Sequence, residues 1–387
     1  MFYKTLARAL VLPFMCAAIE IPHIRSYFYT GGRYIQRSDG EHTMTDQIYV
    51  ERLTPISGPT QPYPIVFIHG ADQTATNWLN KPDGEPGWAS FFLSKGYECY
   101  LLDQAARGRS PLQMERVMKQ KKFSAEALQR LFTATAHHSI WPQSTTHTQW
   151  PGNGTIGDPI FDAYYASTVP SLADHVVQET MMRAAGAALL NDINRPAILI
   201  AHSQGGSMAW PIADEAPHLV HAIVAVEPSG PPFQNPDFFV AKPARAYGLS
   251  DTPLKYMPAV DDPERDITRV MYGSSVPDSL DCILQADNPP PRQLVSLSRF
   301  PVLFVTGESS FHASYDGCTV QYMRQAGMHV EHLQLPSVEI RGNGHMMFLE
   351  KNSDQIASEI SRWIEGTFQQ TGNNFIYPGV SAQQNFR

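Results

Sequence analysis

The sequence contains no apolar run long enough to cross a bilayer. A membrane-spanning helix needs about 20 predominantly apolar residues, and no stretch of the 387-residue chain reaches that length. An excess of basic residues is also missing, because 29 Lys and Arg stand against 37 Asp and Glu, for a formal net charge of −8. Without a basic stripe, the chain lacks the electrostatic footprint of a nucleic-acid-binding protein. We therefore predict no transmembrane segment and no nucleic-acid partner.

Cysteine is scarce, with four residues in the whole chain. Cys16 lies in the N-terminal segment, so cleavage of that segment would leave three cysteines. Of these, Cys282 and Cys318 can form a disulfide, and Cys99 is expected inside a buried strand.

The first 24 residues form a segment of their own. Lys4 and Arg8 precede an apolar run that ends in small residues at Ala18. This order resembles a short secretory signal cleaved near Ala18. The other interpretation is an amphipathic helix packed on the domain. We predict a secreted protein, with a cytoplasmic one as the alternative.

Hydrophobic residues make up 43% of the chain and charged residues 17%, which is typical of a globular protein with a sizeable core. Continuous apolar runs predict buried strands, and helical patterns alternate with them. The runs are 64–69, 98–103, 197–200, 221–227 and 301–306. This alternation predicts an α/β domain over residues 25–387, with a mostly parallel sheet covered by helices on both faces.

Two long excursions interrupt this alternation, at about 104–172 and 228–300. The second is rich in proline and aromatic residues. We predict that they form a cap over the functional site, and extra core of a large domain is the alternative. Near the N-terminus, aromatic and β-branched residues flank Gly31-Gly32, which predicts a hairpin over 26–35 that turns at these glycines.

The central feature is a serine between a predicted strand and a predicted helix. The apolar run 197–200 leads into Ala201-His-Ser203, and a helical pattern follows at once. A sharp strand-to-helix turn with serine at its corner is a nucleophile elbow. The bend needs small neighbours, which Ala201, Gly205 and Gly206 supply. The usual first glycine is Ala201 here, so the motif is a relaxed form.

Chemically active side chains gather at the predicted strand ends, where ligands bind on such sheets. They are His69, Asp103, Ser203, Glu227 and His345. A serine nucleophile needs a base and a third group that orients the base. The last predicted strand covers 329–335, and His345 stands in a glycine-flanked loop after it. This is where the histidine that serves an elbow serine is expected.

The acid has three candidates. Its usual place after the strand at 301–306 is taken by Ser310, which has no carboxylate. Glu308 lies only one residue past the glycine that ends that strand, and Asp316 is expected to cap a helix. Glu227 ends a strongly apolar run, where an unpaired carboxylate would be costly. We favour Glu227 and keep Glu308 and Asp316 as alternatives.

The oxyanion hole is predicted to use two backbone N–H groups, those of Ala71 and Gln204. His137, His138 and His147 suggest a metal at first sight. No carboxylate or cysteine stands near them at ligand spacing, so we interpret them as cap or surface histidines. No cofactor and no metal are expected.

These motifs resemble those of the α/β-hydrolase superfamily over most of residues 25–368. The residues that carry the resemblance are His69-Gly70, Asp103 with Gly108-Arg-Ser110, His202-Ser-Gln-Gly-Gly206 and Gly344-His345. More narrowly, residues 78–88, 103–110, 226–228 and 342–347 resemble the esterase 713-like branch. That resemblance implies a Glu acid after the sixth strand, which favours Glu227. The sequence departs from the pattern of this branch at Ala71-Asp72, where the type member of the branch has two adjacent cysteines.

The predicted function is a serine hydrolase that cleaves a carboxylic ester or lactone through an acyl-enzyme on Ser203. The alternatives are a C–C bond hydrolase, an acyl transferase, or a cyclase or ligand-binding protein without hydrolytic activity on the same scaffold. The aromatic cap predicts an apolar small-molecule substrate. We also expect that the protein can form a homodimer.

Overall fold

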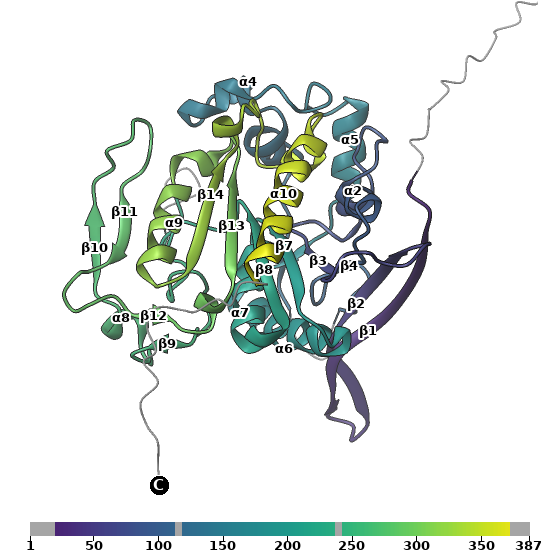
Figure 1. Cartoon of the computed structure of the whole chain (residues 1–387), viewed down its shortest axis with the longest axis horizontal. Helices are drawn as coiled ribbons and strands as arrows, with labels where there is room; N and C mark the ends of the chain where they lie inside the picture. The colour runs from purple at the N-terminus through teal and green to yellow at the C-terminus, as the bar shows by residue number, and fades with distance from the viewer. Residues whose placement is uncertain (1–19, 113–117, 237–241, 372–387) are drawn as a thin grey trace, which may run out of the picture.

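The structure is a computed structural model that describes residues 20–112, 118–236 and 242–371. In this part of the chain, eight strands form one sheet in the order β1-β2-β4-β3-β7-β8-β13-β14 (Figure 1). Their bounds are β1 His23–Gln36, β2 His42–Pro55, β3 Ile65–Ile68, β4 Cys99–Leu102, β7 Ala197–His202, β8 Val220–Val226, β13 Pro301–Thr306 and β14 His329–Gln334. From β4 to β14 neighbouring strands are parallel, as predicted, whereas β1–β2 and β2–β4 are antiparallel.

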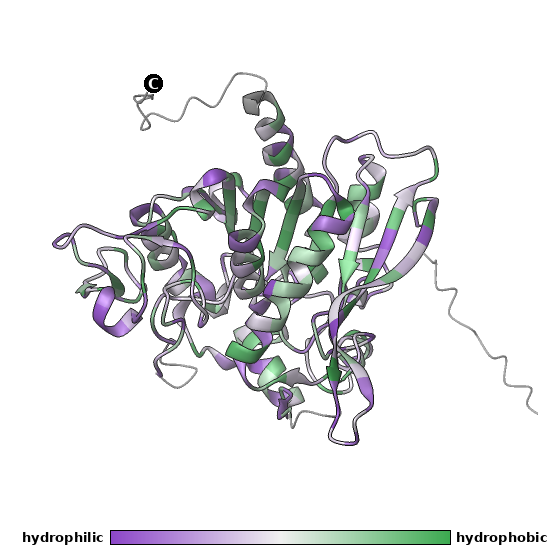
Figure 2. Cartoon of the chain, turned by 90° about the horizontal axis from the view of Figure 1, so that it is seen from below, coloured by the Kyte–Doolittle hydropathy of each residue, from purple (hydrophilic) through white to green (hydrophobic). Residues whose placement is uncertain are grey.

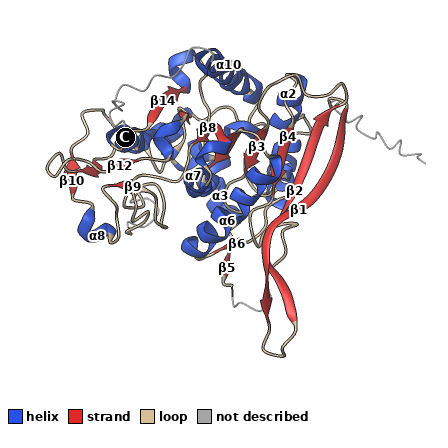
Figure 3. Ribbon diagram, turned by 60° about the horizontal axis from the view of Figure 1, so that its bottom comes forward, coloured by secondary structure: helices blue, strands red, loops and turns tan. Residues whose placement is uncertain are grey.

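Helices cover both faces of the sheet, as the sequence predicts (Figure 3). The main ones are α2 Trp88–Ser94, α6 His175–Ile193, α7 Gln204–Glu215, α9 Asp316–Gln325 and α10 Ser353–Thr371, and a short α1 spans Thr76–Leu79. On β3, Val66 and Ile68 belong to one hydrophobic cluster with α6 and α7, while Ile65 and Phe67 belong to another with α2 and α10. Because side chains alternate along a strand, burial of both faces explains the unbroken apolar runs. Figure 2 shows the same concentration of hydrophobic residues in the central strands.

The outer edge of the sheet is a long hairpin of β1 and β2. Its turn lies between Gln36 and His42, so the predicted turn at Gly31-Gly32 is wrong. Strand β1 continues through both glycines, whose φ values are 68° and 83°. A Cβ on Gly31 would lie 2.9 Å from the Cα of Ala185 in α6. The glycine therefore allows the strand to pass close to the helix, and it does not reverse the chain.

The two long excursions fold into short elements. The first contains β5 Gln120–Lys121, α3 Ala125–Leu128, α4 Thr135–His138, α5 Pro159–Ala166 and β6 Ser171–Leu172. The second contains β9 Tyr256–Met257, α8 Pro263–Asp266, β10 Arg269–Tyr272, β11 Cys282–Gln285 and β12 Gln293–Leu294. Strands β10 and β11 lie beside α9 in Figure 1.

A disulfide between Cys282 and Cys318 joins β11 to α9. The third described cysteine, Cys99, is free and buried in β4, where the sequence placed it. Among the described helices, none is both long and apolar enough to cross a membrane. The predicted signal segment lies mostly outside the described residues.

Candidate active site

Ser203 occupies a one-residue corner between β7 and α7. Its φ of 54° and ψ of −123° fall in a region that non-glycine residues rarely adopt, and such strain concentrates at functional sites. The small neighbours are sterically required. A Cβ on Gly205 would lie 2.5 Å from the carbonyl oxygen of Ile68, and one on Gly206 would lie 2.2 Å from the Cβ of Pro228. The corner therefore lifts the Ser203 side chain above the ends of β3 and β8.

His345 lies beside this serine and bridges it to a carboxylate. Its Nε2 is 3.0 Å from Ser203 Oγ, and its Nδ1 is 2.6 Å from Oε2 of Glu227. The imidazole is buried, with 1% of its surface exposed. With Nδ1–H donating to Glu227, Nε2 carries a lone pair that can accept the Ser203 hydroxyl proton. The three residues form one continuous hydrogen-bonded chain.

Glu227 follows the last residue of β8 and has a φ of 43°. Its carboxylate is fully buried and accepts three hydrogen bonds, from His345, from the N–H of Gly307 at 2.8 Å and from Ser310 Oγ at 2.7 Å. Among the acids named from sequence, this is the one that contacts His345.

The two alternative acids have other partners. Glu308 accepts hydrogen bonds from Arg341 and from the N–H of Gly342, so it holds the start of the loop that carries His345. Asp316 is the first residue of α9 and does not cap it with its side chain, contrary to expectation. Its carboxylate instead contacts Thr306 and His312.

Burial dominates the electrostatics of this chain of residues. Burial raises the pKa of Glu227, and the hydrogen bonds from Ser310 and Gly307 oppose that rise. Burial also holds the pKa of His345 well below its ordinary value, and the neighbouring His202 and His312 lower it further. His345 is therefore a neutral imidazole at neutral pH, which is the form that can act as a base.

The predicted oxyanion donors lie next to Ser203 and line the same cavity. The loop around Ala71 is fixed on both sides. The N–H of Gly70 donates to Gln73, and the N–H of Asp72 donates to Ser171 Oγ at 2.8 Å. The Asp72 carboxylate also accepts from Ser171 Oγ at 2.7 Å, so it attaches this loop to β6. Within the described residues, the N–H groups of Ala71 and Gln204 have no hydrogen-bond acceptor.

Arg107 contacts residues on both sides of the predicted oxyanion site, and the sequence did not reveal these contacts. Arg107 is buried, with 2% of the residue exposed. It donates to the carbonyl oxygen of Gly70 at 2.9 Å and to the Gln204 side chain at 3.0 Å, with a third contact to Gln178. Burial lowers the pKa of Arg107 to about 10, so the group still carries its charge at neutral pH. Arg107 lies in the stretch 103–110 of the narrower resemblance, which gave this residue no function.

A cavity of about 300 Å³ opens above Ser203. Its walls include Phe123, Phe132 and Phe311, but also the charged side chains of Lys121 and Arg245. Residues of both long excursions therefore contribute to the wall. The cavity is amphipathic, and it is less uniformly apolar than the aromatic content of the excursions suggested.

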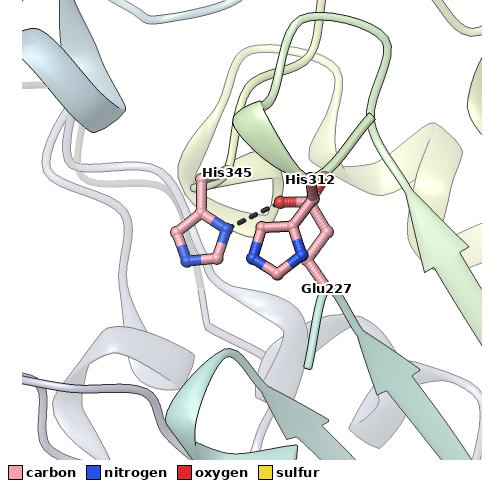
Figure 4. A group of neighbouring side chains, drawn as sticks. All are labelled: Glu227, His312 and His345. Atoms are coloured by element: carbon pink, nitrogen blue, oxygen red, sulfur yellow. Dashed lines mark hydrogen bonds and ion pairs between the residues drawn. The ribbon is translucent and has the colours of Figure 1, made fainter. Parts of the chain in front are cut away.

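His312 is the second residue that the sequence analysis missed. Its buried ring lies parallel to that of His345, with the ring centroids 4.8 Å apart and the planes 4° apart. Figure 4 shows both rings beside the Glu227 carboxylate. The one available signal was the spacing of His312 and Asp316, four residues apart, which a strand-to-helix connection can bring together.

Among the described residues, the histidines considered for a metal do not form a group that could hold an ion. His147 Nε2 lies 2.7 Å from the buried Glu350 carboxylate, which also accepts from the N–H of Gly344. Within the described residues, the group whose side chains are close enough to hold an ion is Glu227, His312 and His345. Two of its members already bond to each other, so the geometry does not favour a metal there.

Comparison with known proteins agrees with this fold. Residues 65–359 match the model of the alpha/beta hydrolase family. The chain is 44% identical over 344 residues to the probable secreted lipase phiG of Fungal sp. (strain ATCC 74256), an alignment that covers 88% of this chain and 90% of the relative. A solved structure, that of a novel bacterial esterase, shares the fold with a TM-score of 0.55 at 22% identity, covering 95% of this chain and 99% of that one. The chain thus belongs to the alpha/beta hydrolase family.

Proposed function

We propose that this protein is a serine hydrolase that cleaves a carboxylic ester through an acyl-enzyme on Ser203. The observation that carries the proposal is the chain of hydrogen bonds from Ser203 Oγ through His345 to Glu227, with lengths of 3.0 and 2.6 Å. A base within hydrogen-bond reach of the hydroxyl, oriented by a carboxylate, is the arrangement that activates a serine.

In this mechanism Ser203 Oγ attacks the ester carbonyl carbon while His345 Nε2 takes the hydroxyl proton. Collapse of the tetrahedral intermediate breaks the bond to the alcohol oxygen, and His345 gives its proton to the leaving alkoxide. Water then attacks the acyl-enzyme, with His345 again as base, and releases the acid. Glu227 fixes the imidazole tautomer and stabilises the imidazolium in both steps.

The N–H groups of Ala71 and Gln204 bind the oxygen on which negative charge develops. Both stand beside Ser203 with no acceptor among the described residues. Preorganised donors of this kind contribute several kcal/mol to the stabilisation of the transition state. The contacts of Arg107 with Gly70 and Gln204 keep the two donors at a fixed separation.

The substrate is a small ester or lactone with an apolar part. The aromatic wall of Phe123, Phe132 and Phe311 suits an acyl chain or ring, and a cavity of about 300 Å³ limits its size. The relative phiG, which is named a probable secreted lipase, supports ester cleavage. The excursions at about 104–172 and 228–300 act as a cap, since both contribute to the cavity wall.

We further propose that the protein is secreted. The relative phiG is named a probable secreted lipase. The bond between Cys282 and Cys318 suits an oxidising compartment, because disulfides persist there and are rare in the cytosol.

Labelling with a fluorophosphonate probe tests the proposal. The wild-type protein should be labelled once, on Ser203, and the Ser203→Ala variant should not be labelled. A panel of esters and lactones of graded acyl size, run on both proteins, then identifies the preferred substrate class. If folded wild-type protein is not labelled and hydrolyses no ester faster than Ser203→Ala, the hydrolase assignment is wrong, and a cyclase or ligand-binding protein takes its place.

A further inference from the structure

His312 lies in the cavity wall next to the reacting groups. It belongs to a 3-10 turn, Phe311–Ser314, that follows β13. Its ring stacks on His345 at 4.8 Å, and His345 Nε2 is 3.0 Å from Ser203 Oγ. A group of the substrate a few bonds from the scissile carbonyl therefore passes close to His312. The mechanism proposed above uses no atom of this residue.

A chain of hydrogen bonds fixes the tautomer of His312. Its Nδ1 lies 2.8 Å from Oδ1 of Asp316. The other carboxylate oxygen, Oδ2, accepts the single hydroxyl hydrogen of Thr306 at 2.8 Å. Burial raises the pKa of Asp316, and the hydrogen bond from Thr306 opposes that rise. While Asp316 is ionised, both of its oxygens are acceptors, and the ring hydrogen of neutral His312 lies on Nδ1. Thr306 Oγ1 in turn accepts from Nε2 of His332, at 2.9 Å.

The other ring nitrogen of His312, Nε2, is left with a lone pair. Within the described residues this nitrogen has no hydrogen-bond partner, and it remains accessible to solvent. Because His312 lines the cavity over Ser203, this nitrogen is open to the cavity. Burial lowers the pKa of His312 to about 4, so the ring is neutral at neutral pH.

We propose that His312 is a substrate-binding residue whose Nε2 accepts a hydrogen bond from a hydroxyl group a few bonds from the scissile ester. The inference rests on the proposed cleavage of esters at Ser203. A bound substrate displaces water from this acceptor, and leaving the acceptor without a hydrogen-bond donor costs free energy. The site therefore discriminates against substrates that lack the hydroxyl. The hydroxyl can belong to the acid, as in a hydroxyacyl ester, or to the alcohol, as in a monoester of a diol or glycerol.

Two matched pairs of esters test the proposal on the full-length enzyme. The first pair is a 3-hydroxyacyl ester and its deoxy analogue with the same chain length and leaving group. The second pair is a 2-hydroxyethyl ester and the ethyl ester of the same acid. We expect kcat/KM to be about tenfold or more higher for the hydroxylated member of one pair than for its partner. The pair that shows this difference tells whether the hydroxyl belongs to the acid or to the alcohol part of the ester.

The variant Asp316→Asn tests the role of the tautomer. Thr306 continues to donate to the amide oxygen, so the amide NH₂ faces His312 and donates to Nδ1. The ring hydrogen then moves to Nε2, which becomes a donor. Because a hydroxyl can accept as well as donate, the readout is the methoxy analogue of the hydroxylated ester, which accepts but cannot donate. Its kcat/KM relative to the hydroxylated ester should rise about tenfold in Asp316→Asn. His312→Phe keeps an aromatic ring against His345 but removes the acceptor, and it should abolish the preference for the hydroxylated ester over the deoxy ester. His218→Phe, at an exposed position, is the control that should keep it.

Two results would overturn the proposal. One is a wild-type enzyme that hydrolyses both members of both pairs equally well. The other is a His312→Phe variant that slows the hydroxylated and the deoxy ester by the same factor through kcat alone, because this would show that the ring only supports His345. Failure of the proposed function has a different signature, since no ester would then be hydrolysed faster than by Ser203→Ala. If one variant does not fold, the other still decides the question.

Discussion

Ser310 Oγ donates a 2.7 Å hydrogen bond to Oε2 of Glu227. Ser310 stands where the acid of this fold usually lies, and Glu227 reaches the same place from the neighbouring strand end. The serine hydroxyl also accepts from the backbone N–H of His312 and so caps the turn at 311–314. The residue at the usual acid position therefore supports Glu227, the acid proposed here, which follows the last residue of β8.

The first prediction concerns the identity of the acid. Replacing Glu227 with Gln should lower kcat by about 10³- to 10⁴-fold, because an amide can fix the wrong tautomer of His345 and cannot stabilise its cation. Ester hydrolysis by purified protein measures this. Glu308→Gln is the matched control and should stay within a few-fold of wild type. Near-native turnover by Glu227→Gln would show that another group orients His345.

The second prediction moves the acid to position 310. The Ser310 hydroxyl lies within hydrogen-bond distance of the Glu227 carboxylate, so an aspartate there can enter the space that Glu227→Ala leaves. The double variant Glu227→Ala/Ser310→Asp should recover about tenfold or more of the activity that Glu227→Ala loses. Glu227→Ala/Ser310→Asn has the same shape without the charge. Equal rates for the two double variants, with both folded, would contradict this account.

The third prediction concerns Arg107. Replacing it with Met removes the donors that join Gly70 to Gln204, so the oxyanion donors lose their fixed spacing. We expect kcat to fall by about 10- to 100-fold with little change in KM, because the donors act mainly in the transition state. Steady-state kinetics and a urea unfolding curve separate this effect from loss of stability. The exposed Arg130→Met serves as control, and an unchanged kcat in folded Arg107→Met would refute the role.

The fourth prediction is a pH profile. Protonation of His345 at low pH removes the lone pair that accepts the serine proton. Burial holds the pKa of His345 below its ordinary value of about 6.5, so kcat/KM should stay high as the pH falls through 7 and decline only below about 6.5. Because Glu227 and His345 share a hydrogen, the midpoint belongs to the pair. Circular dichroism across the same range checks that the protein stays folded, and a midpoint above 7 would contradict the burial argument.

The fifth prediction concerns the bond between Cys282 and Cys318, which closes a loop with a sequence separation of 36 residues. Loss of this constraint on the unfolded chain should lower the free energy of unfolding by about 2 to 4 kcal/mol. Urea unfolding with and without reductant measures it. In the double variant Cys282→Ala/Cys318→Ala, reductant should have no further effect. A wild-type curve that does not move on reduction would show that the bond contributes nothing.

Much of the fold could be predicted because its signals are local. Strands buried on both faces must be apolar throughout, which made β3, β7, β8 and β13 visible in the sequence. The turn of the β1–β2 hairpin was predicted at the wrong place, because a glycine pair at a turn and a glycine pair at a close helix contact look the same in the sequence. Only the position of α6, whose Ala185 touches Gly31, distinguishes the two.

Ser203 and His345 could be selected from sequence for a similar reason. The elbow needs small residues beside the serine, and these leave a readable pattern. His345 lies in a loop where glycine makes a close approach feasible. Arg107 and Gln204, by contrast, meet across 97 residues of sequence, and no local pattern predicts such a contact.

The sequence by itself determined the class of the sheet and selected Ser203 and His345 as the candidate nucleophile and base, since each depends on the chemistry of a short stretch. The sequence favoured Glu227 as the partner of His345 but left Glu308 and Asp316 open, and only the tertiary structure decided which carboxylate contacts which histidine. Glu227 pairs with His345 and Asp316 pairs with His312, because the ends of β8 and β13 lie side by side and the turn at 311–314 brings a second imidazole between them. That pairing depends on distances between residues far apart in the chain, which composition and spacing do not encode.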